Sequence, residues 1–458
     1  MTGDTIAAIA TGMTNSGIGI VRVSGDEAFD IIDRIYKSKT GKKKISEMES
    51  HTVHYGYIMD GNQLIDEVMV LILRAPNTYT REDTIEIDCH GGVLVVQKIL
   101  ETVVKYGARP AEPGEFTKRA FLNGRIDLSQ AESVMDVIQA KNDFALKTSM
   151  EQLKGSVFRV VKELREKIIY EIAYIESALD DPEHYDLTNY GENLSNTLDP
   201  IIKEIEKLLA TADNGKILKE GISTAIVGKP NAGKSSLLNS LVGKERAIVT
   251  DVAGTTRDIL EEQINLNGIS LNMIDTAGIR KTDDVVEKIG VDRAKESMKN
   301  ADLVIYVVDS SKELSKEDYE IVEMIKEKNA IVLLNKCDLT SVVTKEEMIK
   351  LSNKKVISIS AKENIGIDDL EETIKEMFFH GKLEMNDEVY ITNIRHKTAL
   401  RNACDSLKLV KQSIEDQMPE DFYSIDLMSA YEELGSIIGE SVEDDLVNEI
   451  FSKFCMGK

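Results

Sequence analysis

The chain has 458 residues and 42% hydrophobic content, enough for about three domains of ordinary size with packed cores. Its formal net charge is -24, from 80 acidic and 56 basic residues, so a nucleic-acid partner would need a local basic patch or a basic partner protein. The cysteines Cys89, Cys337, Cys404 and Cys455 form no CxxC pair, and neither a secretory signal nor an apolar run of about 18 residues is present. A disulfide framework, a structural zinc site and a membrane span are therefore not expected, and the location is expected to be cytoplasmic.

Residues 1–119 are expected to form an α+β domain. Short β-rich segments alternate with helical patterns there, which is typical of this fold class. The expected strands are 5–10, 19–23, 52–58, 67–73 and 84–89, and the expected helices are 26–36 and 93–106.

Residues 120–215 and 381–458 are predicted to be helical. Apolar residues recur at helical spacing within each flank. The predicted helices are 131–137, 157–179, 201–211, 394–414, 428–439 and 444–454, and turn-rich acidic segments are expected at 180–184 and 193–200. The economical interpretation is one discontinuous helical domain into which residues 216–380 are inserted.

Residues 216–380 alternate strand and helix. The apolar β-rich runs are 223–227, 270–274, 303–308, 330–334 and 356–359. Strands separated by helical patterns predict a mostly parallel sheet with helices on both faces.

The segment Gly228-Lys-Pro-Asn-Ala-Gly-Lys-Ser235 matches the phosphate-binding P-loop pattern. It follows an apolar strand and precedes a predicted helix at 236–241, which is the context that the pattern requires. Gly233 allows the backbone to turn its amides toward phosphates, and the helix N-terminus adds partial positive charge. Lys234 can reach the β- and γ-phosphates, and the Ser235 hydroxyl can bind Mg²⁺.

Two later segments predict contacts to Mg²⁺ and to the γ-phosphate. Asp275 ends an apolar strand in Asp-Thr-Ala-Gly and would hold Mg²⁺ through water, while the Gly278 amide would meet the γ-phosphate. Thr256 is placed to complete the Mg²⁺ shell from a loop. Order in that loop would then depend on the γ-phosphate.

The segments Asn335-Lys-Cys-Asp338 and Ser360-Ala-Lys362 predict selection of guanine. The Asp338 carboxylate can accept from N1–H and from the exocyclic amine of guanine, whereas adenine presents an acceptor at N1 and would be rejected. The Lys336 stem can cover the ring face, and the Ala361 amide can donate to O6. The full predicted GTP site is Asn231, Ala232, Gly233, Lys234, Ser235, Ser236, Thr250, Asp251, Val252, Ala253, Gly254, Thr255, Thr256, Asp275, Thr276, Ala277, Gly278, Asn335, Lys336, Asp338, Ser360, Ala361 and Lys362.

Two features bear on hydrolysis. Ile279 stands where Ras-like proteins place a water-orienting glutamine, so a catalytic polar group must come from elsewhere. Glu287 is a candidate, or it is a solvated acidic residue on a helix. No arginine finger is obvious, and a K⁺ ion held by residues 250–255 and by Asn231 could supply the missing charge. Asn231 could equally be a turn residue.

These motifs, with others along nearly the whole chain, resemble the MnmE/TrmE family of tRNA modification GTPases. The segments that carry the resemblance outside the nucleotide motifs are Gly19-Ile-Val-Arg-Val-Ser-Gly25, Pro76-Asn-Thr-Tyr-Thr80, His90-Gly-Gly92, Ala111-Glu-Pro-Gly-Glu-Phe116, Arg119-Ala-Phe-Leu-Asn123 and Phe454-Cys-Met-Gly-Lys458. The resemblance implies an N-terminal α+β domain that binds folate and dimerises, a discontinuous helical domain, and an inserted Ras-like P-loop GTPase domain.

The resemblance also implies roles for individual residues. Glu287 matches the family's catalytic glutamate, and Cys455 matches a cysteine proposed to act near the tRNA chemistry, although it could be a packed thiol. The remaining matches are K⁺ ligands at Asn231, Thr250, Val252 and Thr255, Mg²⁺ ligands at Ser235 and Thr256, and contacts to a 5-formyl-tetrahydrofolate-type cofactor at Arg22, Glu82, Arg125 and Lys458.

The implied activity is K⁺-stimulated GTP hydrolysis through dimerisation of the GTPase domains. It would drive addition of a carboxymethylaminomethyl or aminomethyl group to C5 of wobble uridine 34 in tRNA. The implied assembly is a homodimer that joins a flavin-dependent partner protein, forming a heterotetramer. The alternative is a regulatory or ribosome-assembly GTPase without modification chemistry, a class that usually carries a basic RNA-binding extension.

Overall fold

The computed structural model describes residues 3–39, 41, 44–181, 183–185, 187–244, 262–266, 269–274, 298–379, 389–440, 444–454 and 457. The chain divides into two compact units. The first contains Met1–Ile138, Met150–Leu198 and Asn402–Lys458, and the second contains Gln139–Ser149 and Asp199–Arg401.

A mixed sheet forms the N-terminal part of the first unit. The strands described there lie in the order β3-β4-β5-β6-β2-β1-β7, antiparallel except for the β1–β7 pair. Their bounds are β1 Ile6–Ile9, β2 Ile18–Ser24, β3 Tyr36–Ser38, β4 Thr52–Asp60, β5 Gln63–Leu73, β6 Thr84–His90 and β7 Arg109–Pro110.

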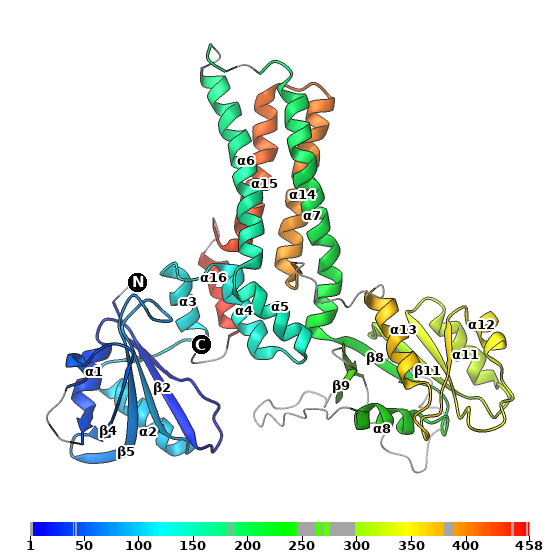
Figure 1. Ribbon diagram of the computed structural model, residues 1–458, viewed down its shortest axis with the longest axis horizontal. Helices are drawn as coiled ribbons and strands as arrows, with labels where there is room; N and C mark the ends of the chain where they lie inside the picture. Colours follow the sequence, from blue (N-terminus) through cyan, green and yellow to red (C-terminus); the bar gives the residue numbers. More distant parts are fainter. Residues whose placement is uncertain are drawn as a thin grey trace. The chain divides into compact units, whose positions relative to one another are not determined.

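Two helices, α1 (Ala28–Ile35) and α2 (Val93–Lys105), pack against this sheet (Figure 1). Alternate residues of β2 point into the shared core, so Val21 and Val23 are buried with Ile99 of α2. This alternation follows from the two-residue period of a strand. The predicted α+β architecture of the N-terminal region is confirmed.

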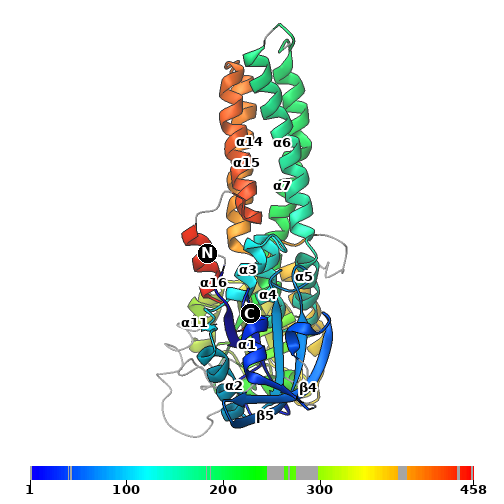
Figure 2. The same ribbon diagram turned by 90° about the vertical axis from the view of Figure 1, so that its left-hand side faces the viewer.

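Long helices form the second part of the first unit. They are α6 (Ser156–Asp180), α15 (Glu420–Ile438), and the portions of α7 (Tyr190–Glu220) and α14 (Ile394–Glu415) that belong to this unit. Figures 1 and 2 show these helices running side by side.

Arg165 joins the two helical flanks. The guanidinium of this buried residue on α6 donates to the Tyr431 carbonyl oxygen at 3.2 Å, lies 4.0 Å from the Tyr431 ring centroid and pairs with Glu440. The flanks, separated in sequence by the nucleotide-binding motifs, therefore pack together. This confirms the predicted discontinuous helical domain.

The expected turn at 193–200 is wrong, because these residues belong to α7 and Pro200 lies inside the helix. Leu194 and Leu198 are fully buried at helical spacing. Their burial outweighs the cost of an internal proline, about 3 kcal/mol.

Shorter helices complete the first unit: α3 (Glu115–Leu122), α4 (Leu128–Gln139), α5 (Asp143–Leu153, shared with the second unit) and α16 (Asp444–Ser452). Phe451 of α16 packs 6.3 Å from Phe121 of α3, measured between ring centroids. The predicted boundaries at 119 and 215 fall within α3 and α7, and the division into four segments stays a prediction.

The second unit contains a sheet in the order β13-β12-β11-β8-β10-β9, parallel except for the β9–β10 pair. The strands are β8 Ile222–Val227, β9 Glu262–Leu266, β10 Ile269–Met273, β11 Leu303–Asp309, β12 Ala330–Asn335 and β13 Lys355–Ser358. Every residue of β11 and β12 is buried, which is typical of parallel strands covered on both faces.

Helices cover both faces of this sheet. α8 (Lys234–Lys244) and α13 (Ile367–Phe379) contribute to one apolar core, and α11 (Lys316–Ile325) and α12 (Lys345–Ser352) contribute to the other. Neighbouring β11 residues alternate between them, with Val307 in the first core and Tyr306 in the second. The predicted mostly parallel sheet with helices on both faces is confirmed.

Candidate functional site

The candidate nucleotide site lies at the carboxyl edge of the parallel sheet. β8 leads into the phosphate loop, β12 ends at Asn335, and β13 leads into Ser360-Ala-Lys362. The carboxyl ends of parallel strands meet at one edge, where ligands of open α/β sheets bind. The sheet order therefore gathers three motifs that are far apart in the sequence.

Within the phosphate loop, Lys234 forms hydrogen bonds to the backbone of the same loop. The Lys234 ammonium donates to the carbonyl oxygens of Gly228 at 2.6 Å and of Lys229 at 2.7 Å. Burial lowers the pKa of Lys234, because a cation in a poorly solvated loop is disfavoured. The carbonyl groups compensate part of this cost, and they hold the ammonium beside the loop that the sequence assigns to phosphates.

Asn335 links the phosphate loop to the predicted guanine-binding segments. Its side-chain amide donates to the Ala232 carbonyl at 2.8 Å, and its carbonyl oxygen accepts from the Ala361 amide at 3.1 Å. Gly233 has φ +101, and a Cβ there would lie 2.0 Å from the Asn335 side-chain nitrogen. Glycine is therefore required at this close approach.

Asp338 presents an exposed carboxylate beside this linkage. Its Oδ1 accepts from the Ser360 hydroxyl at 2.6 Å. This hydrogen bond is the main cause that lowers the pKa of Asp338, so the group is ionised at neutral pH. The arrangement suits a carboxylate that accepts two hydrogen bonds from guanine.

Asp309 was not singled out by the sequence analysis. It is the last residue of β11, it is buried, and its Oδ2 accepts from the Lys336 ammonium at 2.6 Å. Burial opposes its charged form, but hydrogen bonds from Lys336 and Ser311 outweigh that effect and lower the pKa of Asp309. The sequence did carry one signal for this residue. Asp309 is an acidic residue at the end of an apolar strand, and that strand, β11, is the neighbour of β12 in the sheet.

The other nucleotide predictions divide into two groups. Ser235 and Ser236 lie in the first turn of α8, where the Ser235 hydroxyl fits a Mg²⁺ ligand, and Asn231 is exposed in the loop with φ +63. Lys362 is exposed after β13. Outside the described residues lie Thr250, Asp251, Val252, Ala253, Gly254, Thr255, Thr256, Asp275, Thr276, Ala277, Gly278 and Glu287.

In the N-terminal domain, two of the predicted folate contacts gather around Tyr79. The guanidinium carbon of Arg125 lies 4.7 Å from the Tyr79 ring centroid, and that of Arg22 lies 5.8 Å from it. Arg22 also donates to Glu86 at 2.7 Å and to the Gly457 carbonyl at 3.3 Å. The two guanidinium groups over this ring place positive charge that can attract an anionic ligand.

Glu82, the third described folate candidate, accepts from Ser24 at 2.8 Å and pairs with Arg119 at 3.1 Å. Sequence reasoning assigned no role to Arg119 or Tyr79, although both stand in segments that carry the family resemblance. Lys458 and Cys455 lie outside the described residues.

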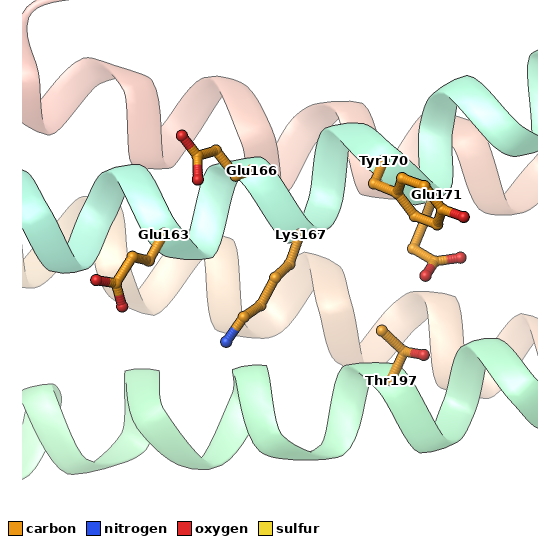
Figure 3. A pocket seen from close by; sticks show the side chains of 6 residues that line it. All are labelled: Glu163, Glu166, Lys167, Tyr170, Glu171 and Thr197. Atoms are coloured by element: carbon orange, nitrogen blue, oxygen red, sulfur yellow. The ribbon is translucent and has the colours of Figure 1, made fainter.

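A separate hollow of about 560 Å³ lies on the helical part of the first unit. Figure 3 shows Lys167 and Glu171 extending from α6 toward α7, which contributes Thr197. The other lining residues are Glu163, Glu166 and Tyr170, so no residue of the predicted sites lines it.

Neither a metal-binding cluster nor a membrane-spanning helix occurs among the described residues. No group of three or more His, Cys, Asp or Glu residues there could hold a metal ion. In the same part of the chain, every helix is too short or too polar to span a bilayer.

The chain is similar to known proteins over its full length. A family model described as MnmE helical domain matches residues 128–455, and one described as GTP-binding protein TrmE N-terminus matches residues 5–125. The tRNA modification GTPase MnmE of Lachnoclostridium phytofermentans is 62% identical over 455 residues, 99% of both chains. The tRNA modification GTPase MnmE of Bacillus subtilis is 49% identical over 459 residues, 99% of this chain and 100% of the relative. Among solved structures, the G domain of the T. maritima FeoB iron transporter is 26% identical with a TM-score of 0.26, covering 34% of this chain and 97% of that one.

Proposed function

The chain belongs to the MnmE family of tRNA modification GTPases, and we propose that its GTP hydrolysis drives modification of wobble uridine 34 in tRNA. The product would carry a carboxymethylaminomethyl or aminomethyl group at C5. The observation that supports a guanine-nucleotide site best is the Asn335 side chain, which joins the phosphate loop to the base-selecting segments.

In this proposal the described residues bind and orient GTP. Lys234 would contact the β- and γ-phosphates, Ser235 would ligate Mg²⁺, and Asp338 would pair with the guanine edge. Thr256, which lies outside the described residues, would be a second Mg²⁺ ligand. Mg²⁺, when bound, neutralises charge on the phosphates. Glu287 would activate the attacking water, and Asn231 with residues 250–255 would hold K⁺ in place of an arginine finger.

The transfer of the one-carbon group to uridine would take place away from the GTP site. Arg22, Glu82, Arg125 and Lys458 would bind a formyl-tetrahydrofolate-type donor, and we add Tyr79, whose ring contacts Arg22 and Arg125. A flavin-dependent partner protein would complete the reaction in the cytoplasm, and Cys455 would lie near the tRNA chemistry. The proposed domains are 1–119, 120–215, 216–380 and 381–458.

Mass spectrometry of tRNA nucleosides tests this function. Cells lacking the gene should lose a C5-substituted wobble uridine, wild-type chain should restore it, and Lys234→Ala should not. Glu287→Ala should bind GTP nearly normally in vitro but hydrolyse it at least ~10²-fold more slowly, because it loses general-base assistance.

Unchanged wobble nucleosides in the deletion strain would contradict the proposal and favour a regulatory GTPase. The folate assignments would then be the first to abandon. A Glu287→Ala rate within about twofold of wild type would remove Glu287 from the catalytic role without affecting the tRNA result.

A further inference from the structure

Lys229, the second residue of the phosphate loop, has a partner that the loop pattern does not assign. Its ammonium lies 2.5 Å from Asp318 Oδ2 and donates to the Ser315 hydroxyl at 3.1 Å. The Asp318 side chain is 2% exposed and that of Lys229 is 25% exposed. The loop is thus tied to the start of α11, on the second face of the sheet.

Asp318 is a built anchor for this lysine. Its Oδ2 accepts from the Ser315 amide at 2.7 Å, in the capping box that begins α11, and its Oδ1 accepts from the Tyr306 hydroxyl at 2.8 Å. Tyr306 is fully buried in the central strand β11. The carboxylate therefore joins the loop, a helix and the centre of the sheet.

Charge makes this link specific. Burial alone would raise the pKa of Asp318, but the hydrogen bond from Lys229, with those from Ser315 and Tyr306, holds it below its ordinary value. Serine and tyrosine are neutral donors, so Lys229 is the member of this cluster that supplies positive charge. Truncating one partner of a buried charge pair leaves the other uncompensated.

The anchor acts on the same short segment that holds Lys234. The Lys234 ammonium donates hydrogen bonds to the carbonyl oxygens of Gly228 and of Lys229 itself. β8 fixes the chain up to Val227, and the Lys229 side chain fixes it two residues later. Without the second attachment, both carbonyl groups and the lysine that they hold could shift together.

We propose that Lys229 and Asp318 are positioning residues for phosphate binding. The pair holds residues 228 and 229 so that Lys234 is presented to the β- and γ-phosphates. This inference rests on the proposed assignment of residues 228–235 as the GTP phosphate loop.

Titration of the full-length chain with GTP, GDP and inosine triphosphate (ITP) tests the inference. Lys229→Met removes the charge and keeps most of the stem, and it should weaken binding of GTP and GDP by about tenfold. The preference for GTP over ITP should not change, because the base contacts through Asp338 are untouched. Lys229→Arg, which keeps the charge, should bind GTP within about threefold of wild type.

Two variants complete the design. Asp318→Asn should weaken GTP binding as Lys229→Met does, and the double variant should bind no more weakly than Asp318→Asn alone, because contacting residues are not additive. Lys326→Met is the matched control, since Lys326 directly follows the last residue of α11 and pairs with the exposed Glu323. It should bind GTP as wild type does.

The outcomes separate this inference from the proposed function. If Lys234→Ala binds GTP like wild type, the loop assignment itself is wrong. If Lys234→Ala loses binding while Lys229→Met stays within about twofold of wild type, the inference is overturned and the loop assignment stands. A Lys229→Met chain with a lower melting temperature but unchanged affinity would also overturn it. Should Lys229→Met not fold, Asp318→Asn, which is similar in size, decides the question.

Discussion

At the scale of single residues, the contacts of Asn335 explain why an asparagine stands at the start of the segment Asn335-Lys-Cys-Asp338. One carboxamide donates to the Ala232 carbonyl and accepts from the Ala361 amide. An aspartate could not donate to a carbonyl, and a leucine would leave both backbone groups without this partner. The side chain therefore organises two segments of the site through contacts within the protein.

Asp338→Asn should shift nucleotide preference from GTP toward xanthosine triphosphate. An amide can donate to the additional carbonyl oxygen of xanthine, whereas the carboxylate accepts from the amine of guanine. Competition binding with both nucleotides measures the shift. The Ser360 hydrogen bond holds the pKa of Asp338 below its ordinary value, so the carboxylate stays ionised and the wild-type preference for GTP over ITP should stay constant from about pH 8 down to about pH 5. Unchanged guanine selectivity in the variant would mean that the base contact is misassigned.

Sequence order was enough to anticipate the segments that lie together, but not all of their partners. The positions of Asn335, Lys336 and Asp338 follow from a motif after an apolar strand. Asp309 could not be assigned in this way, because its contact with Lys336 depends on β11 and β12 being neighbours in the sheet. Arg119 was missed for a similar reason, since its partner Glu82 comes from a distant loop.

At the scale of elements, burial on two faces made the central strands easy to predict. The apolar run 303–308 became β11 (Leu303–Asp309), and 330–334 became β12 (Ala330–Asn335). The bounds of the first helix of the second flank were also predicted closely: 394–414 was expected, and α14 spans Ile394–Glu415. α7 was predicted too short because local turn propensity around Pro200 was weighed without the burial of Leu194 and Leu198.

Gly215 gives α7 its place against the chain that returns from the nucleotide-binding motifs. A Cβ at this helical glycine would lie 2.3 Å from the Ile391 carbonyl oxygen, and Thr211, one turn earlier, accepts from the Ile391 amide at 3.2 Å. Gly215→Ala should therefore lower the free energy of opening of α7 amides by about 1–3 kcal/mol, because the crossing backbone must move. Native-state hydrogen exchange measures this quantity.

The sign of that change is decisive. In an exposed helix, glycine to alanine stabilises by about 1 kcal/mol, and the exposed Ala210 in α7 offers the reverse substitution, Ala210→Gly, as a calibration of helix propensity alone. If Gly215→Ala stabilised α7, the backbone around Ile391 would be able to move away from the added methyl group at little cost, and the prediction would be wrong.

At the scale of the whole molecule, charge is the property that most constrains its partners. A net charge of -24 opposes the approach of tRNA and of a second identical chain. The proposed complex with a partner protein is compatible with this charge, since a basic partner could supply the surface that binds tRNA. The full-length matches confirm the family resemblance drawn from the motifs, whereas the partner, folate and K⁺ assignments remain proposals.

Dimerisation of two such acidic chains through their GTPase domains should depend on the cation that is present. If K⁺ is held at Asn231 and residues 250–255, it adds positive charge beside the transferring phosphoryl group, where water is excluded. Replacing K⁺ by Na⁺ at fixed ionic strength should slow GTP hydrolysis by at least about tenfold, with general screening unchanged. Asn231→Ala is the matched variant and should show similar, slow rates in both salts. Equal wild-type rates in K⁺ and Na⁺ would remove the cation role.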